Sequence, residues 1–206
     1  MKERNLEQKK TPMWIDLVRH GMTRGNEERR YIGITDEPLS ERGRKLAEQC
    51  MYEMPEIVFS SPLKRCVETA EILYPDQDIY IIEELRECDF GIFEGKNAEE
   101  LSKSNATIPF PGGESREGFR SRCLLGWKKV ISVCQEQQKK SAAVVTHGGV
   151  IMNLMETVTA FEKSFYEWHV KNLCGYSIYI EKELEKNGKL DLTCGTDGFS
   201  YGSLHW

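Results

Sequence analysis

Two segments of the 206-residue chain each combine an apolar run with a histidine and a glycine. Residues 13–21 read MWIDLVRHG, so Arg19 and His20 directly follow the apolar run, and residues 142–149 read AAVVTHGG, which ends on His147 and two glycines. Glycine allows a ligand close to the backbone and leaves an amide that can face an anion. Imidazole and guanidinium groups bind phosphate oxygens, and a guanidinium can hold two at once. The two segments therefore predict a shared phosphate site.

A histidine at the end of a strand is more often a hydrogen-bonded packing residue than a ligand. Only four histidines are present, however, and two of them stand in strand–His–Gly units, which favours a shared site. His169 and His205 lack this context, and we interpret the first as structural and the second as a surface residue. If the two strands are neighbours in a parallel sheet, His20 and His147 face each other across one crevice, because the carboxyl ends of such strands share an edge.

The pattern along the chain predicts an α/β fold, a three-layer sandwich with a mostly parallel central sheet. Short apolar runs alternate with segments in which apolar residues recur at helical spacing, which is typical of a sheet covered on both faces. We expect strands at 13–18, 56–61, 79–82 and 142–146, helices at 39–54 (with Ser40 as N-cap), 62–74, 116–139 and 148–160, and late edge-type strands at 176–181 and 190–194.

Composition and charge exclude several classes of function. The net charge of −5 argues against an obligate nucleic-acid partner, because phosphate backbones bind basic surfaces. No apolar run reaches the roughly eighteen residues that a membrane span requires. The charged start, MKERNLEQKKTP, lacks the apolar region of a secretory signal. Seven scattered cysteines show no metal-ligand spacing, so we expect reduced thiols and a cytoplasmic location.

The pattern of predicted elements along the chain also indicates one domain. We expect it to cover residues 13–206, after a flexible N-terminal tail at 1–12. Residues 86–115 form the long irregular stretch of the sequence, with PGGES at its end. Such a stretch inside a compact domain is often functional, so we predict a lid or insertion there.

Two further residues stand near the predicted crevice. Arg65, in SSPLKRCVETA, lies in the first turn of the helix after the second strand and should face the same crevice, where the helix N-terminus also favours an anion. Glu87, in LRECDFGIFEG, lies just past the third strand. From the pattern alone, Glu87 is more readily an ordinary loop carboxylate.

Six blocks of sequence resemble the histidine phosphatase superfamily, the phosphoglycerate-mutase-like group, over about residues 14–160. The blocks are LVRHGMTRGN, DEPLSERG, SSPLKRCVETA, LRECDFGIFEG, PGGES and VTHGGV, and they occur in the order found in that family. The resemblance implies the family's three-layer fold and phosphoryl-transfer chemistry. It also implies that no metal and no cofactor are needed, because the cationic cluster neutralises the phosphate charge.

The resemblance assigns roles to the matching positions. His20 becomes the nucleophile that forms a phosphohistidine, and it must be neutral because an imidazolium has no lone pair to attack with. Glu87 becomes the acid that protonates the leaving group, in place of the ordinary carboxylate above. Burial and the phosphate's negative charge should raise its pKa for that purpose.

The remaining matches surround the phosphate. Arg19, Arg65 and His147 resemble the family's phosphate clamp, which offsets charge during in-line transfer. Thr23, Asn26 and the amide of Gly148 match positions that donate hydrogen bonds to the same group.

Within the family, the sequence favours a phosphatase. The first loop, RHGMTRGN, lacks the acidic residue and tryptophan usual in mutases, and the segment between Glu87 and GGES is short. The ending WHVKNLCGYSIYIE is similar to that of α-ribazole phosphatases of cobalamin synthesis, which suggests α-ribazole 5′-phosphate as substrate. The alternatives are mutase-type phosphoryl transfer, a broad-specificity phosphatase, and a non-catalytic phosphate-binding module.

We expect the partner to be a small phosphorylated metabolite, with no nucleic acid and no membrane, and the protein to be a monomer or homodimer. Arg24, Arg29, Arg30 and the residues around Phe110 are candidates for setting substrate choice.

Overall fold

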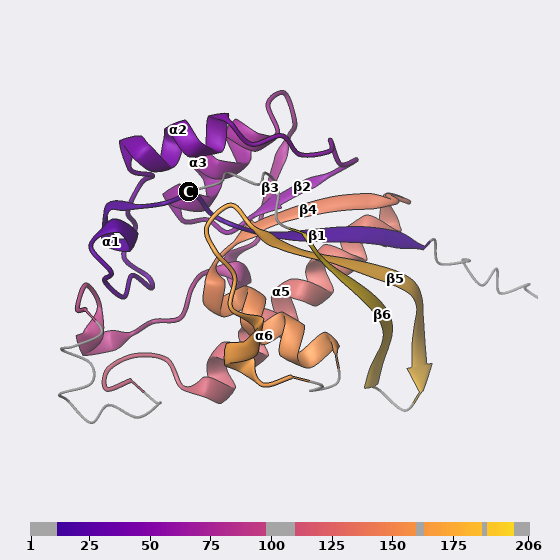
Figure 1. Cartoon of the computed structure of the whole chain (residues 1–206). Helices are drawn as coiled ribbons and strands as arrows, with labels where there is room; N and C mark the ends of the chain where they lie inside the picture. The colour runs from indigo at the N-terminus through magenta and orange to yellow at the C-terminus, as the bar shows by residue number, and fades with distance from the viewer. Residues whose placement is uncertain (1–11, 98–109, 160–162, 187–188, 200–206) are drawn as a thin grey trace, which may run out of the picture.

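A six-stranded sheet lies at the centre of the computed structural model, which describes residues 12–97, 110–159, 163–186 and 189–199 (Figure 1). The predicted tail, except Pro12, and positions 98–109 of the predicted lid lie outside the described residues. The strands are β1 (Met13–Arg19), β2 (Val58–Ser60), β3 (Ile79–Ile81), β4 (Ser141–Thr146), β5 (Gly175–Lys186) and β6 (Lys189–Phe199). The α-helices are α1 (Arg24–Glu27), α2 (Glu41–Glu48), α3 (Lys64–Leu73), α5 (Arg116–Glu136) and α6 (Gly148–Val158), and the 3₁₀ helices are η1 (Glu83–Leu85), η2 (Gly91–Phe93) and η3 (Phe165–Trp168).

The strand order is β3-β2-β4-β1-β5-β6. The pairs β3–β2, β2–β4 and β4–β1 are parallel, and β5 runs antiparallel to both β1 and β6. The predicted mostly parallel sheet is therefore confirmed. The expectation of two late edge strands is half wrong, because β5 pairs on both sides and only β6 lies at that edge.

The sheet has a hydrophobic core on each face, which makes the fold a three-layer sandwich as predicted. Alternate residues of a strand point to opposite faces. Leu17 and Val144 accordingly join the core under α5 and α6, while Val18 and Val145 join the core under α2 and α3. Figure 1 shows the two helix pairs on opposite sides of the sheet.

Two serine caps fix where helices begin. Ser40 Oγ accepts a hydrogen bond from the amide of Gly43, and Ser115 Oγ accepts one from the amide of Gly118, both at 3.0 Å. Such caps satisfy amides that have no partner inside the helix. Helix α2 ends at Glu48, earlier than the predicted residue 54, and the side chains of Met51 and Met54 are exposed. The apolar residues at 51 and 54 thus gave a misleading helical signal.

The connections of the sheet create a crevice between β1 and β4. The chain leaves β1 for α2 on one face and leaves β4 for α6 on the other face. At such a switch point the two connections diverge beyond the carboxyl ends of the strands and leave room for a ligand. Among the described helices, none is long and apolar enough to cross a membrane.

Candidate active site

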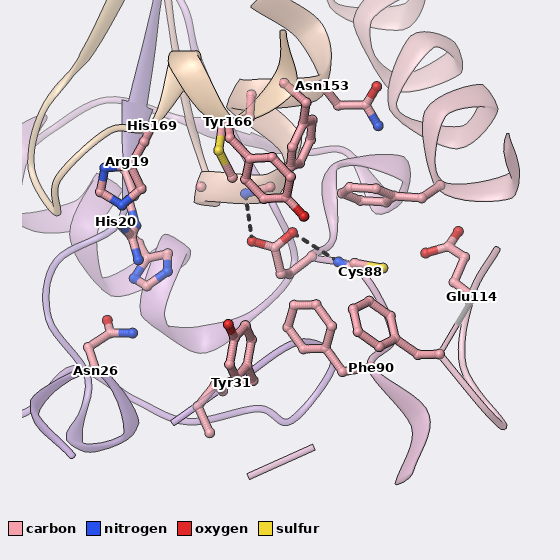
Figure 2. A pocket seen from close by; sticks show the side chains of 18 of the residues that line it. Arg19, His20, Asn26, Tyr31, Cys88, Phe90, Glu114, Asn153, Tyr166 and His169 are labelled. Carbon is pink, nitrogen blue, oxygen red and sulfur yellow. Dashed lines mark hydrogen bonds between the residues drawn. The ribbon is translucent and has the colours of Figure 1, made fainter. Parts of the chain in front are cut away.

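A cavity of about 520 Å³ lies at the carboxyl ends of β1 and β4 (Figure 2). The predicted site residues that line it are Arg19, His20, Asn26, Glu87 and Gly148. The other three, Thr23, Arg65 and His147, are buried and do not line it. The structure therefore divides the predicted site residues into those that face the cavity and those behind its wall.

His20 follows β1 directly and is held in one tautomer. Its Nδ1 lies 2.7 Å from the carbonyl oxygen of Gly21, and because a carbonyl only accepts, Nδ1 carries the proton. Nε2 therefore keeps its lone pair. Burial, followed by the charges of Arg65 and Arg19, lowers the pKa of His20 well below its usual value of 6.5. The imidazole is accordingly neutral at neutral pH, as a nucleophile must be.

Arg19 lies at the same end of the cavity as His20, and one nitrogen of its guanidinium group has no hydrogen-bond partner among the described residues. One guanidinium nitrogen, Nη1, donates to the carbonyl of Val170 at 2.7 Å, whereas Nε is buried without a hydrogen-bond partner. A buried donor without a partner is costly in free energy. An anion at this end of the cavity would satisfy the donor, so Arg19 suits the binding of a phosphate oxygen.

His147 and His20 lie next to each other, as expected from neighbouring strands. Residues Arg19 and Thr146 pair across β1 and β4, and the two imidazole rings are 5.2 Å apart between centroids, edge to face. Arg65 Nε donates to His147 Nδ1 at 3.2 Å, so the ring proton is on Nε2 and is donated to Ser61 Oγ at 2.7 Å. Both ring nitrogens of His147 therefore already have protein partners.

Arg65 is turned inward rather than toward solvent. It is 1% exposed, and its two terminal nitrogens donate to the carbonyls of Gly33 at 2.6 Å and Thr35 at 2.8 Å. Its charge therefore acts on the neighbouring imidazoles from behind the cavity wall. Direct contact of Arg65 or His147 with a phosphate stays a prediction.

Glu87 lines the same cavity, and two backbone amides hold its carboxyl group. The amide of Cys88 donates to Oε1 and that of Gly149 donates to Oε2, each at 2.9 Å (Figure 2). Burial raises the pKa of Glu87 above 4.5, although the two amides and the charges of Arg65 and Arg19 oppose the shift. The raised pKa is the direction that an acid catalyst needs.

The sequence analysis did not identify Asn172, whose side chain connects the backbone at His20 to the side chain of Asn26. Its Nδ2 donates to the carbonyls of His20 at 2.9 Å and Gly21 at 3.3 Å, and to Asn26 Oδ1 at 3.1 Å. The amide of Thr23 also donates to Asn26 Oδ1, at 3.2 Å, and these bonds orient the Asn26 side chain at the cavity. Asn172 stands in the WHVKNLCGYSIYIE block, but a single asparagine there carried no signal of this role.

The interpretation of His169 as a structural residue is wrong, because its side chain is exposed and lines the cavity near Arg19 (Figure 2). Arg29, Arg30 and Phe110 also line the cavity, as the substrate-choice prediction requires, whereas Arg24 does not.

Part of the cavity wall is aromatic and consists of Tyr31, Phe90 and Phe110, which we call the aromatic wall. The rings of Tyr31 and Phe90 are 5.5 Å apart and those of Phe90 and Phe110 are 5.0 Å apart, both edge to face. Both distances are typical of favourable aromatic pairs. The cavity therefore has a polar, cationic end at His20 and an apolar region beyond it.

No cluster of three or more possible metal-ligating side chains occurs among the described residues. The cysteines whose side chains are described, at positions 50, 66, 88, 123, 134 and 174, are free thiols.

Comparisons with known proteins agree with this fold. The family model of the histidine phosphatase superfamily (branch 1) matches residues 15–188. The uncharacterized phosphatase PhoE of Bacillus subtilis (strain 168) is 29% identical over 191 residues, which cover 90% of this chain and 97% of that protein. Phosphoserine phosphatase 1 of Hydrogenobacter thermophilus is 28% identical over 196 residues, which cover 86% of this chain and 92% of that protein.

A solved structure, the α-ribazole phosphatase from Shigella flexneri, has a TM-score of 0.71 and 24% identity, covering 82% of this chain and 92% of that chain. At this identity the likeness shows the fold. Fold and site together define an α/β enzyme of phosphate-ester chemistry. The chain belongs to the histidine phosphatase superfamily, and within it to the phosphatases, which hydrolyse phosphate monoesters.

Proposed function

We propose that this phosphatase hydrolyses a small phosphorylated metabolite through a phosphohistidine at His20. The observation that carries the proposal is the state of His20. Its Nδ1 proton is donated to the Gly21 carbonyl, its pKa is lowered, and it lines the same cavity as Glu87. A neutral imidazole with a free Nε2 lone pair beside an arginine is suited to attack phosphorus.

The reaction then has two steps that use the same two side chains. In the first, the Nε2 lone pair of His20 forms a bond to phosphorus, the bond from phosphorus to the ester oxygen breaks, and Glu87 gives its proton to that oxygen. In the second, water attacks the phosphohistidine, Glu87 takes a proton from the water, and the bond between Nε2 and phosphorus breaks. Inorganic phosphate leaves, and both residues return to their starting states.

The charges around His20 support this sequence of steps. Arg19 and Arg65 oppose protonation of the nucleophile, and they also stabilise the negative charge of a phosphoryl group in transfer. Burial keeps Glu87 protonated to higher pH than a free carboxyl group, as its first step requires. Because the two arginines stabilise the negative charge themselves, we infer that the phosphate clamp of Arg19, Arg65 and His147 acts without a metal.

The aromatic wall supports a substrate whose alcohol part is apolar or aromatic. Tyr31, Phe90 and Phe110 offer ring faces and edges to such a group once its phosphate is at His20. α-Ribazole 5′-phosphate, with its aromatic base, fits this description, and with that substrate the enzyme would act in cobalamin biosynthesis. The free thiols support a cytoplasmic location.

The test is to trap the phosphoenzyme. The Glu87→Gln variant still accepts phosphate from 4-nitrophenyl phosphate, whose leaving group needs no proton, but it activates water poorly. It should therefore accumulate an acid-labile, alkali-stable phosphoryl group at about one per chain, and His20→Ala should accumulate none. We expect hydrolysis by the unchanged enzyme to persist in EDTA. Full turnover by His20→Ala would refute the mechanism.

A panel of phosphate esters, including α-ribazole 5′-phosphate and phosphoserine, would then rank substrates by kcat/KM. Isomerisation of 3-phosphoglycerate in the presence of 2,3-bisphosphoglycerate, faster than hydrolysis, would instead show a mutase. Saturable phosphate binding without turnover of any ester would show a binding module.

A further inference from the structure

Arg122, on α5, binds the chain segment that carries Glu87. Its Nη1 donates to the carbonyls of Glu84 at 2.9 Å and Arg86 at 2.7 Å, and its Nη2 donates to the carbonyl of Glu87 at 3.2 Å. The other side of the guanidinium pairs with Glu114, from Nε to Oε1 at 2.9 Å and from Nη2 to Oε2 at 2.6 Å. The side chains of this pair are only 17% and 20% exposed, so water competes weakly for them.

One peptide group connects Arg122 to the carboxyl group of Glu87. The carbonyl of Glu87 accepts from Arg122, and the N–H of the same peptide group, which belongs to Cys88, donates to Glu87 Oε1 at 2.9 Å. A trans peptide group is rigid and planar, with its carbonyl and N–H pointing in opposite directions. Arg122 therefore fixes the direction of the N–H that holds the carboxyl group. A rotation of this peptide group would break both hydrogen bonds.

Glu114 belongs to the PGGES block, to which the mechanism above gives no role. Its own amide donates to the carbonyl of Asp89 at 2.9 Å, which anchors the block to the segment after Glu87. The next residue, Ser115, caps the helix on which Arg122 lies. The block therefore places a carboxylate where it fixes the guanidinium of Arg122 in a bidentate geometry.

We propose that Arg122, fixed by Glu114, is a positioning residue that aims the carboxyl group of Glu87 for proton transfer to the leaving group. The inference depends on the proposed role of Glu87 as the acid. Arg122 does not line the cavity, so its effect passes through the Glu87–Cys88 peptide group. Its loss should therefore slow the hydrolysis of esters whose leaving group needs a proton and spare esters whose leaving group does not.

Three aromatic esters of similar size test this difference: 4-nitrophenyl, phenyl and benzyl phosphate, in order of increasing need of the leaving group for a proton. In Arg122→Gln, kcat/KM for benzyl phosphate should fall about 10- to 100-fold, a partial loss of the acid's contribution, and that for 4-nitrophenyl phosphate less than about 3-fold. Arg122→Lys keeps the charge but cannot bind all four partners, so it should behave in the same way. Glu114→Gln should reproduce part of the loss.

Lys129→Gln is the matched control, because Lys129 lies on the same helix and pairs with the side chain of Glu84 at 2.5 Å, whereas Arg122 binds the backbone of that segment. Lys129→Gln should leave the ratio of kcat/KM for benzyl phosphate to kcat/KM for 4-nitrophenyl phosphate unchanged. Melting curves followed by circular dichroism should show that all variants fold. An equal loss for all three esters in both Arg122 variants, or the same bias in Lys129→Gln, would overturn the proposal.

Glu87→Gln separates this proposal from the mechanism on which it rests. If Glu87→Gln shows the leaving-group bias and the Arg122 variants do not, the positioning role is refuted and the acid role of Glu87 stands. If Glu87→Gln itself shows no bias, Glu87 is not the acid, and both proposals fall together.

Discussion

The amide of Gly149 donates to Glu87 Oε2 at 2.9 Å, and a Cβ atom at residue 149 would lie 2.4 Å from Glu87 Oε1. Helix α6 therefore approaches the carboxyl group so closely that residue 149 has no room for a side chain. Real Cβ atoms essentially never come within 3.0 Å of a heavy atom, so any larger residue must displace the carboxyl group. The second glycine of VTHGGV is thus explained by its distance from Glu87.

Gly149→Ala should lower kcat/KM for benzyl phosphate by about 10- to 100-fold, because the displaced carboxyl group no longer reaches the leaving oxygen. Steady-state kinetics and a melting curve check this. Gly148→Ala is the neighbouring comparison. Its Cβ would meet Arg19 at 3.4 Å, an ordinary contact, and we expect a smaller loss. Equal losses in the two variants would contradict the role of the close approach.

The pH profile of kcat/KM should follow the charges around His20. Burial and then Arg65 and Arg19 lower the pKa of His20, so activity should persist below pH 6.5 and fall only where the imidazole becomes protonated. Arg65→Gln removes the larger of the two charge effects and should move this acid limb to higher pH. Lys64→Gln, at the exposed neighbouring residue, should leave the limb in place. An unmoved limb in Arg65→Gln would show that Arg65 does not set the pKa of His20.

The stability of the protein should fall in mild acid because His20 and His147 are buried in the neutral form. Their pKa values are lowered in the folded state, by burial first and then by Arg65, whereas in the unfolded chain they return to about 6.5. The unfolded chain therefore binds more protons below pH 6.5, and stability is lost as the pH falls through that value.

Each of these imidazoles should reduce the free energy of unfolding by at most about 1.4 kcal/mol per pH unit in that range. Urea unfolding at several pH values between 7 and 5 measures the slope. His147→Asn should reduce it relative to the unchanged protein, while His169→Asn, at an exposed imidazole, should leave most of it. An unchanged slope in His147→Asn would show that its imidazole is protonated in the folded state.

The aromatic wall should determine which alcohol groups the enzyme accepts. Phe90→Ala removes the central ring and should raise KM for benzyl phosphate about 5- to 20-fold, with a smaller effect on glycerol 3-phosphate, because the apolar contact area is lost. Ile92→Ala is a control on the same loop, since Ile92 is exposed and does not line the cavity. An equal effect of Phe90→Ala on both esters would indicate that the ring only supports the loop.

The fold was predictable where local pattern and global packing agree. Alternating residues such as Leu17 and Val18 face different cores, and the strands at 13–18 and 142–146 were located within one residue at each end. The prediction was wrong where the same local pattern is compatible with more than one structure. Nothing local distinguishes an edge strand from β5, because β6 follows it in the chain but its second neighbour, β1, comes from the opposite end of the sequence. The apolar residues at 51 and 54 continue a helical pattern but remain exposed.

The sequence by itself determined which kinds of side chain form the candidate site and that its two histidines lie at the ends of strands. His20 and His147 each follow an apolar strand and precede a glycine, and parallel strands bring such residues to one edge. Tertiary structure decided which side chains face the cavity, since Arg65 and His147 are occupied by protein partners while His169 and Asn172 line the wall. It also decided the protonation states, because these depend on burial and on charges that lie far away along the chain.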